Sequence, residues 1–265
     1  MNELLLVSLS FIVGIVVGLT GIGGASLITP MLILVFQVPT SIAVSSDVVA
    51  ATLMKIVGGV RHWRQQTLDL QVVKWLACGS VPGSLLGVAL LHQLHQAKTL
   101  NLDAFLLHLI GMTILLITLM ALLQMMILII HPGFQFPNLP VLDLSTFKGR
   151  IGAISIGAIL GCLVGMTSVA SGSLFALVLI ACFRLDAQKL VGTDLTQAAI
   201  LLVFTALGHL SLGTVDWHLV MFIWLGSVPG VWLGARLCQA AQQKPLRFSI
   251  YAILVMVSWR LVRSV

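Results

Sequence analysis

The chain has 265 residues, of which 59% are hydrophobic and 8% are charged, and its mean hydropathy is +1.11. A soluble domain carries about 25% charged residues, so this composition excludes a soluble globular protein and predicts an integral membrane protein. The net charge is +6, and so few basic groups exclude a nucleic-acid-binding surface. The apolar runs exceed the ~10 alternating residues of a barrel strand, which predicts membrane-spanning α-helices.

The four cysteines lie in or beside apolar segments and form neither a CxxC motif nor a Cys/His metal-ligand spacing. Buried cysteines commonly act as small hydrophobic residues. The chain also contains no large soluble segment in which separate catalytic machinery could fold. We therefore expect no metal, no other cofactor and no catalytic residues, and predict that the protein is not an enzyme. The first apolar run lacks a basic n-region, so we expect no cleavable signal peptide.

The first apolar segment contains a cluster of small residues, GIVVGLTGIGGASLITP at residues 14–30. Each glycine inside a helix costs roughly 1 kcal/mol relative to alanine, so we expect a break between two helical arms, Leu5–Thr20 and Ala25–Phe36. About 20 apolar residues are needed to cross a bilayer, and the second arm is too short to cross alone. We predict a re-entrant hairpin or a broken helix. The alternative is close packing between helices, which the GxxxG spacing of Gly14 and Gly18 also permits.

Three longer apolar segments follow the break, at Ile42–Val60, about Leu70–Leu91 and Phe105–Ile130. Prolines gather after the third segment, as is typical of a linker. The apolar pattern then begins again. We therefore divide the chain into a first transmembrane repeat, an inter-repeat linker and a second transmembrane repeat, at residues 1–130, 131–149 and 150–265.

The second half repeats the first at a constant offset of 147 residues, so that Gly161 corresponds to Gly14. Shared hydrophobicity alone cannot place polar residues at one offset. Such a duplication is common in secondary transporters. The sequence GSVPG recurs at this offset, and so do three pairs of polar residues: Asp47 with Asp194, His62 with His209, and Asp69 with Asp216.

The basic residues of equivalent loops alternate between the two halves. The loop at 61–74 carries three basic residues and the segment at 184–189 carries two, whereas their counterparts carry none. Because basic residues favour the cytoplasmic side, equivalent loops are expected to face opposite sides. This predicts inverted repeats, each with a hairpin and three spans. Arg260 and Arg263 do not fit, since the count places them outside. We assign four segments to the cytoplasm: 61–74, 131–150, 184–189 and 236–247.

The second copy of the break, GMTSVASGS at residues 165–173, keeps the small and hydroxyl residues. In inverted repeats the two breaks would meet near the midplane. Helix N-termini there carry about +0.5 charge each and expose unpaired N–H groups, and together with hydroxyl groups they suit an anion. We predict that a small anion binds Thr20, Gly21, Gly23, Gly24 and Ser26 of the first break and Thr167, Ser168, Ser171, Gly172 and Ser173 of the second.

Two carboxylates, Asp47 and Asp194, lie inside apolar segments. A charged residue in such a place is a functional candidate, and each carboxylate could carry a proton or contact the substrate. Each also stands near the predicted start of a helix, so capping or a hydrogen-bonding scaffold is the structural alternative. We predict a coupling or scaffold role and leave both forms open.

Lys55 and two histidines complete the candidate set. Lys55 lies eight residues after Asp47, roughly on the same side of a helix, and could pair with it or contact an anion. Alternatively, its side chain extends to the cytoplasmic interface. Its counterpart in the second repeat is Leu202. His62 and His209 end their segments at equivalent points, where each could titrate near neutral pH or form interfacial hydrogen bonds.

The chain resembles the TauE/SafE family of membrane transporters, also called the sulfite exporter family, over nearly its whole length. The resemblance implies a transporter of small sulfur-containing anions, such as sulfite or organosulfonates, across the bacterial cytoplasmic membrane. It rests on five motifs: GLTGIGGASLITP (18–30), AVSSD (43–47), VGTDLTQAA (191–199), GHLSLGTVDW (208–217) and GSVPGVWLGARL (226–237).

The expected protein is thus an all-α, polytopic secondary transporter with two inverted repeats, each with a Gly/Ser-rich broken or re-entrant helix pair. Its expected partners are a small anion and the lipid bilayer, and a homodimer stays open. We expect export, because an inside-negative potential favours anion exit by ~2.3 kcal/mol per charge per 100 mV. The alternatives are a passive anion channel and, less favoured, an intramembrane redox or metal protein that uses the histidines.

Overall fold

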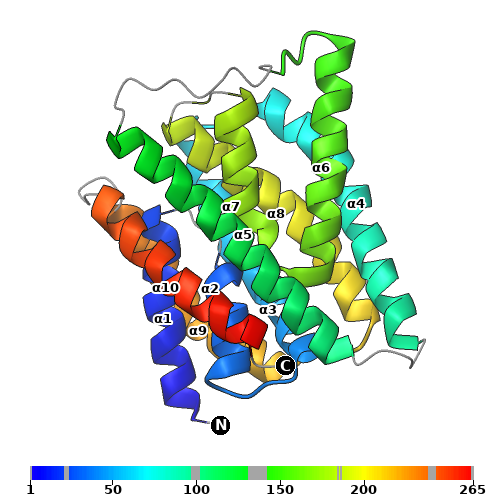
Figure 1. The fold of residues 1–265 in the computed structure, drawn as a ribbon, viewed down its shortest axis with the longest axis vertical. Coiled ribbons are helices and arrows are strands. Elements are labelled where there is room, and N and C mark those ends of the chain that lie inside the picture. The colour runs from blue at the N-terminus through cyan, green and yellow to red at the C-terminus, as the bar shows by residue number, and fades with distance from the viewer. Residues whose placement is uncertain are drawn as a thin grey trace.

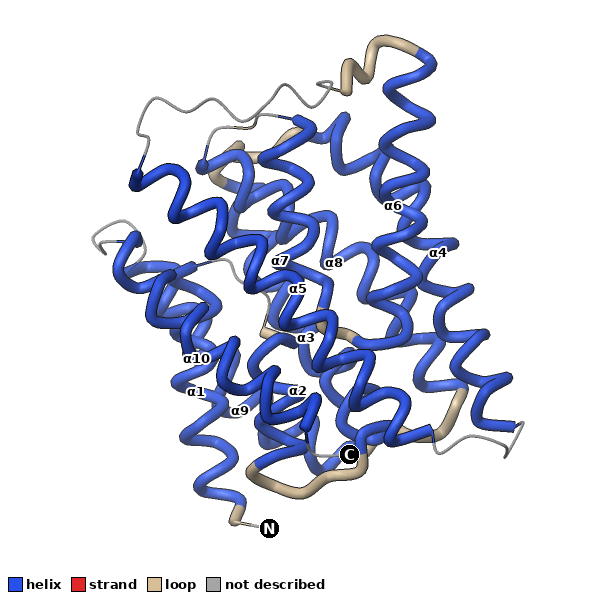
Figure 2. The backbone as a smooth tube through the Cα atoms, in the orientation of Figure 1, coloured by secondary structure: helices blue, strands red, loops and turns tan. Residues whose placement is uncertain are grey.

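The computed structural model describes residues 2–20, 24–96, 102–130, 142–183, 185, 187–237 and 243–263. Within these ranges the chain is almost wholly helical and contains no β-strand (Figures 1 and 2), which confirms the predicted all-α fold. The α-helices are α1 (Glu3–Thr20), α2 (Ala25–Leu34), α3 (Thr40–Arg64), α4 (Leu70–Gln96), α5 (Leu102–Ile130), α6 (Phe147–Thr167), α7 (Ala170–Val178), α8 (Ala187–Ser211), α9 (Trp217–Leu237) and α10 (Gln243–Arg263), and a π-helical turn at Leu179–Phe183 continues α7.

Six of the described helices are long and apolar enough to cross a membrane: α3, α4, α5, α6, α8 and α9. This finding agrees with the predicted multi-pass membrane protein. Helix α6 has 21 residues, about the number that a span needs, whereas α7 has 9. The second break therefore joins a full-length helix to a short one.

The two halves of the chain contain matching elements. Helices α3 and α8 both have 25 residues, and their bounds differ by the same offset of 147 that relates the two sequences. Helix α1 packs on α9, and the matching helices α6 and α4 pack on each other. In Figure 1, α1 runs upward from the N-terminal end, whereas α6 begins at the opposite end. The orientation of the repeats across a membrane stays a prediction.

Glycines allow two helix pairs to approach closely. A Cβ added at Gly83 of α4 would lie 2.2 Å from the carbonyl oxygen of Ala158 in α6, and one at Gly161 of α6 would lie 2.2 Å from that of Ser80. At the α1–α9 interface, a Cβ at Gly14 would lie 2.5 Å from the carbonyl oxygen of Ser227. Small residues serve this purpose in membrane helices. The GSVPG segments and Gly14 are therefore packing elements.

Helix α5 presents an apolar stripe to the surroundings. Met112, Leu116, Leu119 and Leu123 recur at the spacing of one helix face, and each is at least half exposed. Lipid tails are as apolar as leucine, so this face suits contact with the predicted bilayer.

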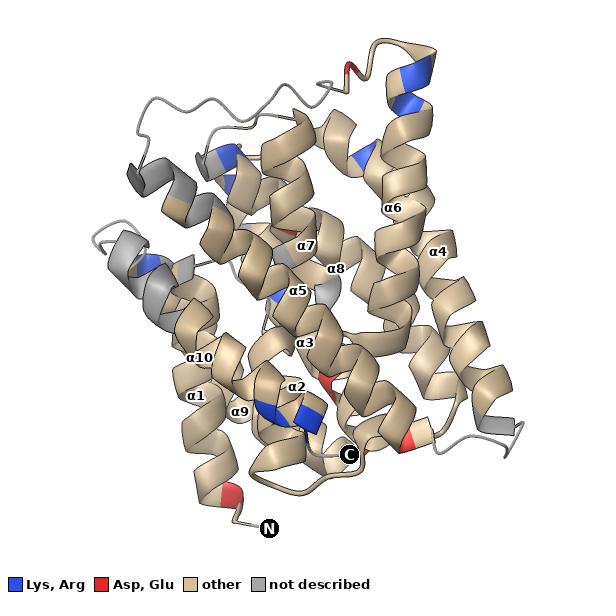
Figure 3. Cartoon of the chain, in the orientation of Figure 1, with Lys and Arg blue, Asp and Glu red and all other residues tan. Residues whose placement is uncertain are grey.

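Basic residues gather at one end of the helix bundle, where α6 begins, and a smaller basic patch lies near the end of α10 (Figure 3). The first group includes Lys74 near the start of α4 and Arg150 near the start of α6. These two cations lie 5.6 and 5.1 Å from the ring centre of Trp75. Tryptophan and basic side chains mark membrane interfaces. Residues 61–74, for which the positive-inside rule predicts the cytoplasmic side, lead into α4 at this end.

Matching aspartates immediately precede α4 and α9 and also connect the two repeats. Asp69 Oδ1 accepts hydrogen bonds from the backbone N–H groups of Gln71 and Val72, both at 3.1 Å. The backbone N–H of Asp69 donates to Thr193 Oγ1 of α8 at 3.0 Å. At the equivalent place the N–H of Asp216 donates to Ser46 Oγ, also at 3.0 Å. Each aspartate is thus the N-cap of its helix.

We expect Asp69→Ala to lower the free energy of unfolding by about 1 kcal/mol, because it removes the N-cap acceptor of α4. The measurement is the Tm of the purified protein in detergent. Asp69→Asn is the control, since its side-chain oxygen still accepts the capping hydrogen bonds. Equal losses of Tm in the two variants would show that capping is not the reason.

Candidate functional site

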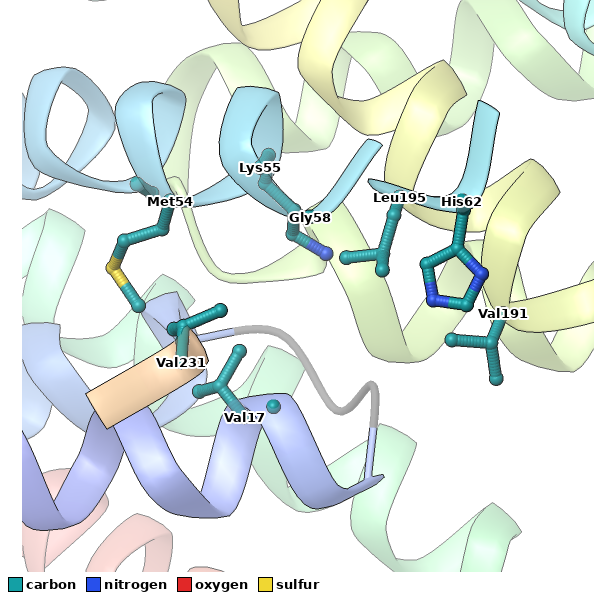
Figure 4. A pocket seen from close by; sticks show the side chains of 11 residues that line it. Val17, Met54, Lys55, Gly58, His62, Val191, Leu195 and Val231 are labelled. Carbon is teal, nitrogen blue, oxygen red and sulfur yellow. The ribbon is translucent and has the colours of Figure 1, made fainter. Parts of the chain in front are cut away.

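A narrow cavity lies beside the first break, between α1, α3, α8 and α9 (Figure 4). Its volume is about 30 Å³, above the ~10–15 Å³ that one ordered water needs. Most of the wall is apolar, and Lys55 and His62 of α3 supply its charged and titratable groups. The lining residues are Val17, Gly18, Gly24, Ala51, Met54, Lys55, Gly58, His62, Val191, Leu195 and Val231.

Lys55 is the buried cation of this cavity, with 2% of its surface exposed. Its Nζ lies 3.6 Å from Oδ2 of Asp194 in α8. The side chain therefore does not extend to the interface, and it does not pair with Asp47. Eight residues of helix rise about 12 Å along the axis, so Asp47 and Lys55 are too far apart to pair although they lie roughly on the same side of α3. The crossing of α3 and α8 supplies the partner instead.

The Lys55–Asp194 pair lacks part of its possible hydrogen bonds. Lys55 Nζ has no hydrogen-bond partner among the described residues, and neither does Asp194 Oδ1. An ammonium group has three N–H donors, and leaving buried charged groups without hydrogen bonds is costly. The N–H groups of Lys55 therefore lack acceptors among the described residues, and Lys55 lines a cavity. An anion or ordered water could accept from it there.

The two equivalent histidines have different surroundings. His62 lines the cavity, and its Nδ1 lies 2.9 Å from Thr67 Oγ1. His209 is completely buried, with Nε2 2.9 Å from the carbonyl oxygen of Gly165 and Nδ1 3.0 Å from Ser45 Oγ. A carbonyl oxygen only accepts, so Nε2 must carry the hydrogen. His209 thus connects α8 to α6 and α3, and is not interfacial.

Asp47 forms a second cluster, in which both broken segments meet. It is completely buried, and its Oδ2 accepts from Thr29 Oγ1 of α2 at 2.5 Å and from Ser168 Oγ at 3.1 Å. Its Oδ1 has no partner among the described residues. Helix α3 begins at Thr40, so Asp47 lies too deep in the helix to cap it, and the same holds for Asp194, since α8 begins at Ala187. The capping alternative is therefore wrong, and Asp47 has the geometry of a hydrogen-bonding scaffold.

The second break turns at Ser168, whose φ of 62° lies in the left-handed region. This conformation is uncommon outside glycine, and the sequence counterpart of Ser168 is Gly21. Thr167 Oγ1 donates to the carbonyl oxygen of Leu163 in its own helix. Ser171 is completely buried, and its Oγ has no partner among the described residues. Gly172 is also buried.

Only some of the residues predicted to bind the anion lie together in the described part of the structure. Gly24 lies at the cavity with Lys55, and Ser26 is buried in the first turn of α2. Ser168 contacts Asp47 instead. Gly21 and Gly23 lie outside the described residues, as do the side chains of Thr20 and Ser173.

Sequence reasoning missed Gly18, Thr29 and Ser45. Gly18 is not among the predicted anion-binding residues, yet it lines the cavity. The counterparts of Thr29 and Ser45 at the offset of 147 are Ala176 and Gly192. The duplication therefore gave no signal for either residue, because their hydrogen bonds exist in one repeat only.

Comparison with known proteins shows which family the chain resembles. A family model described as "Sulfite exporter TauE/SafE" matches residues 6–261. The chain is 35% identical to the "Probable membrane transporter protein YjnA" of Bacillus subtilis (strain 168), over 97% of this chain and 98% of that protein. It is 23% identical to "Probable membrane transporter protein YdhB" of the same organism, over 94% and 95% of the two chains. No solved structure matches.

Proposed function

Because the chain belongs to the TauE/SafE family of membrane transporters, we propose that it is a secondary transporter of small sulfur-containing anions, such as sulfite or organosulfonates. The family description supports the class of anion. The names of the two relatives specify membrane transport alone. The expected direction is export across the bacterial cytoplasmic membrane, as the membrane potential favours.

The burial of Lys55 beside a cavity is the observation that supports this proposal. This lysine has no hydrogen-bond partner among the described residues, and it faces a cavity inside the helix bundle. A buried ionisable group in a membrane protein commonly marks a substrate path. Its ammonium supplies the full positive charge that the sequence-based site lacked. A sulfur oxyanion offers several oxygen acceptors to such a group.

The start of α2 adds backbone donors to this site. Helix α2 begins beside the cavity at Gly24, which supplies no side-chain cap. The N-terminus of a helix attracts anions because its first N–H groups point outward and its dipole is positive there. We therefore place the anion between Lys55 and this N-terminus, with His62 toward the end of α3. Ser26 lies in the same first turn.

Inverted repeats would supply the two-sided access that a carrier needs. In the proposed arrangement the repeats are inverted, and α3 and α8, one from each repeat, cross at the centre. Asp47 holds α2 to the second break, so we expect it to couple the two broken segments. Its Oδ1, which has no hydrogen-bond partner among the described residues, is the candidate proton acceptor. The narrow volume of the cavity favours a carrier over an open channel.

The test is uptake of ³⁵S-labelled sulfite, thiosulfate and sulfoacetate into proteoliposomes with an imposed pH gradient. We expect saturable accumulation of at least one anion above its outside concentration, and none in protein-free liposomes. Everted membrane vesicles test the direction, because an exporter accumulates the anion inside them. Current without accumulation would support a passive channel instead. Absence of uptake of all three by folded protein would refute the assigned substrate class.

A further inference from the structure

The Lys55–Asp194 pair breaks the symmetry of the duplication. Asp194 has a counterpart in Asp47, but Leu202 stands where the second repeat would carry a lysine. The ion pair therefore occurs in one orientation, with the cation on α3 of the first repeat and the carboxylate on α8 of the second. Both side chains are 3% exposed. One buried cation thus faces one buried carboxylate across the interface between the repeats.

The geometry of this pair is not that of a purely structural ion pair. The Nζ–Oδ2 distance of 3.6 Å exceeds the 2.7–2.9 Å of a charge-assisted hydrogen bond. Neither Nζ nor Asp194 Oδ1 has another partner among the described residues. A buried ion pair offsets its desolvation only with good geometry and further hydrogen bonds. These two groups attract each other, but the contact leaves room at the ammonium on its cavity side.

We propose that Asp194 is a tethered competitor of the transported anion for Lys55. In the empty site the carboxylate compensates the buried ammonium. An anion that enters the cavity meets the same ammonium, and the negative charges repel each other strongly at such distances in a protein interior. Binding therefore displaces Asp194 from Lys55. The identity of the anion rests on the proposed function, whereas the competition follows from the ion pair itself.

Displacement of Asp194 could also couple anion binding to a movement of the two repeats relative to each other. The pair joins α3 to α8, which are the central helices of the two repeats. When the anion takes the place of the carboxylate, this connection between the repeats is lost. A ligand shifts a conformational equilibrium only through contacts that differ between the two states. Asp194 provides such a difference, and it is a positioning residue for the anion.

The test is the Tm of the full-length protein in detergent as a function of sulfite concentration. A ligand that binds the folded state raises Tm by mass action, which yields an apparent Kd. Asp194→Asn removes the competitor and leaves Lys55 uncompensated. We expect its apparent Kd for sulfite to be at least about tenfold lower than that of the wild type. Lys55→Gln/Asp194→Asn, which lacks the cation, should lose this response.

Asp216→Asn is the matched control, because it makes the same chemical change at an aspartate that caps α9 and does not line the cavity. It should show no gain in the response to sulfite. If Asp194 had only a structural role, Asp194→Asn would have a lower Tm than the wild type. Sulfite would then raise the Tm of the variant no more than it raises that of the wild type. An equal apparent Kd in Asp194→Asn and wild type therefore overturns the proposal.

Asp194→Glu keeps the charge and tests the same idea without an uncompensated lysine. Its longer side chain brings the carboxylate nearer to Lys55, so sulfite should bind more weakly than to the wild type. Unchanged or tighter binding would contradict the proposal. The proposed function can fail separately. If Asp194→Asn gains a Lys55-dependent response to sulfite while no sulfur anion is transported, the competition stands and the transport assignment falls.

Discussion

Lys55→Gln should lower the uptake of the transported anion into proteoliposomes by at least about 100-fold in Vmax/KM, equivalent to about 2.7 kcal/mol. Removing one partner of a buried charge contact typically costs ~2–5 kcal/mol. Lys55 is the cation at the cavity, so glutamine removes the full charge that attracts the anion. We expect the main change in KM, because the lysine acts by binding. Initial rates over a range of anion concentrations measure both quantities.

The single variant also leaves Asp194 buried without a cation, which could destabilise the protein by itself. The Lys55→Gln/Asp194→Asn variant separates the two effects, because replacing both partners of a buried ion pair is often neutral for stability. It should keep a Tm near that of the wild type and still fail to transport. Lys74→Gln, which removes a lysine near the start of α4, is the surface control. Transport at the wild-type rate by the double variant would refute the proposal that Lys55 binds the anion.

Gly161→Leu should greatly lower the yield of folded protein. A Cβ at this position would lie 2.2 Å from the carbonyl oxygen of Ser80 and 2.7 Å from its Cα. Both are backbone atoms, so no side chain can rotate away, and α6 must separate from α4. Overpacking typically costs ~1–3 kcal/mol, and we expect at least about 3 kcal/mol here because the obstacle is backbone. The yield of monodisperse protein on size exclusion and its Tm measure the loss.

Gly59→Ala is the matched control in another helix. A Cβ there would meet its nearest atoms at 3.5 Å, which is ordinary van der Waals contact, and alanine is the better helix former. Its yield and Tm should equal or exceed those of the wild type. Gly161→Ala should fall between the two, since only its Cβ clashes. A normal yield of Gly161→Leu would mean that α4 and α6 are not packed as closely as the structure shows.

Much of the fold could be predicted from the residues alone. A chain with 8% charged residues cannot remain soluble as a globular domain, and its apolar runs have the length of helical spans. The offset of 147 residues correctly paired Thr40–Arg64 with Ala187–Ser211, because duplicated segments bury equivalent faces. The family could also be recognised from local motifs and was confirmed by the comparison.

The candidate site was harder to predict. Sequence reasoning selected Lys55, Asp47 and Asp194 correctly as unusual residues, since charge inside an apolar segment is expensive. It offered Asp47 as one possible partner of Lys55 and capping as one possible role of the aspartates, and the structure contradicts both. Both errors came from treating each helix separately, since the partner of Lys55 lies on α8 and Asp47 is held by α2 and the second break. The hydrogen bond between Ser168 and Asp47 crosses 121 positions of sequence, and no periodicity predicts such a contact.

The sequence by itself thus determined the membrane environment, the helical class, the duplication and the two breaks, because these follow from composition and from local backbone preferences. Only the tertiary structure decided that Lys55 pairs with Asp194 and that Asp47 binds Thr29 and Ser168. The physical reason is that side-chain partners depend on how helices cross. Those crossings are set by packing over whole faces, including the glycine contacts that let α4 approach α6.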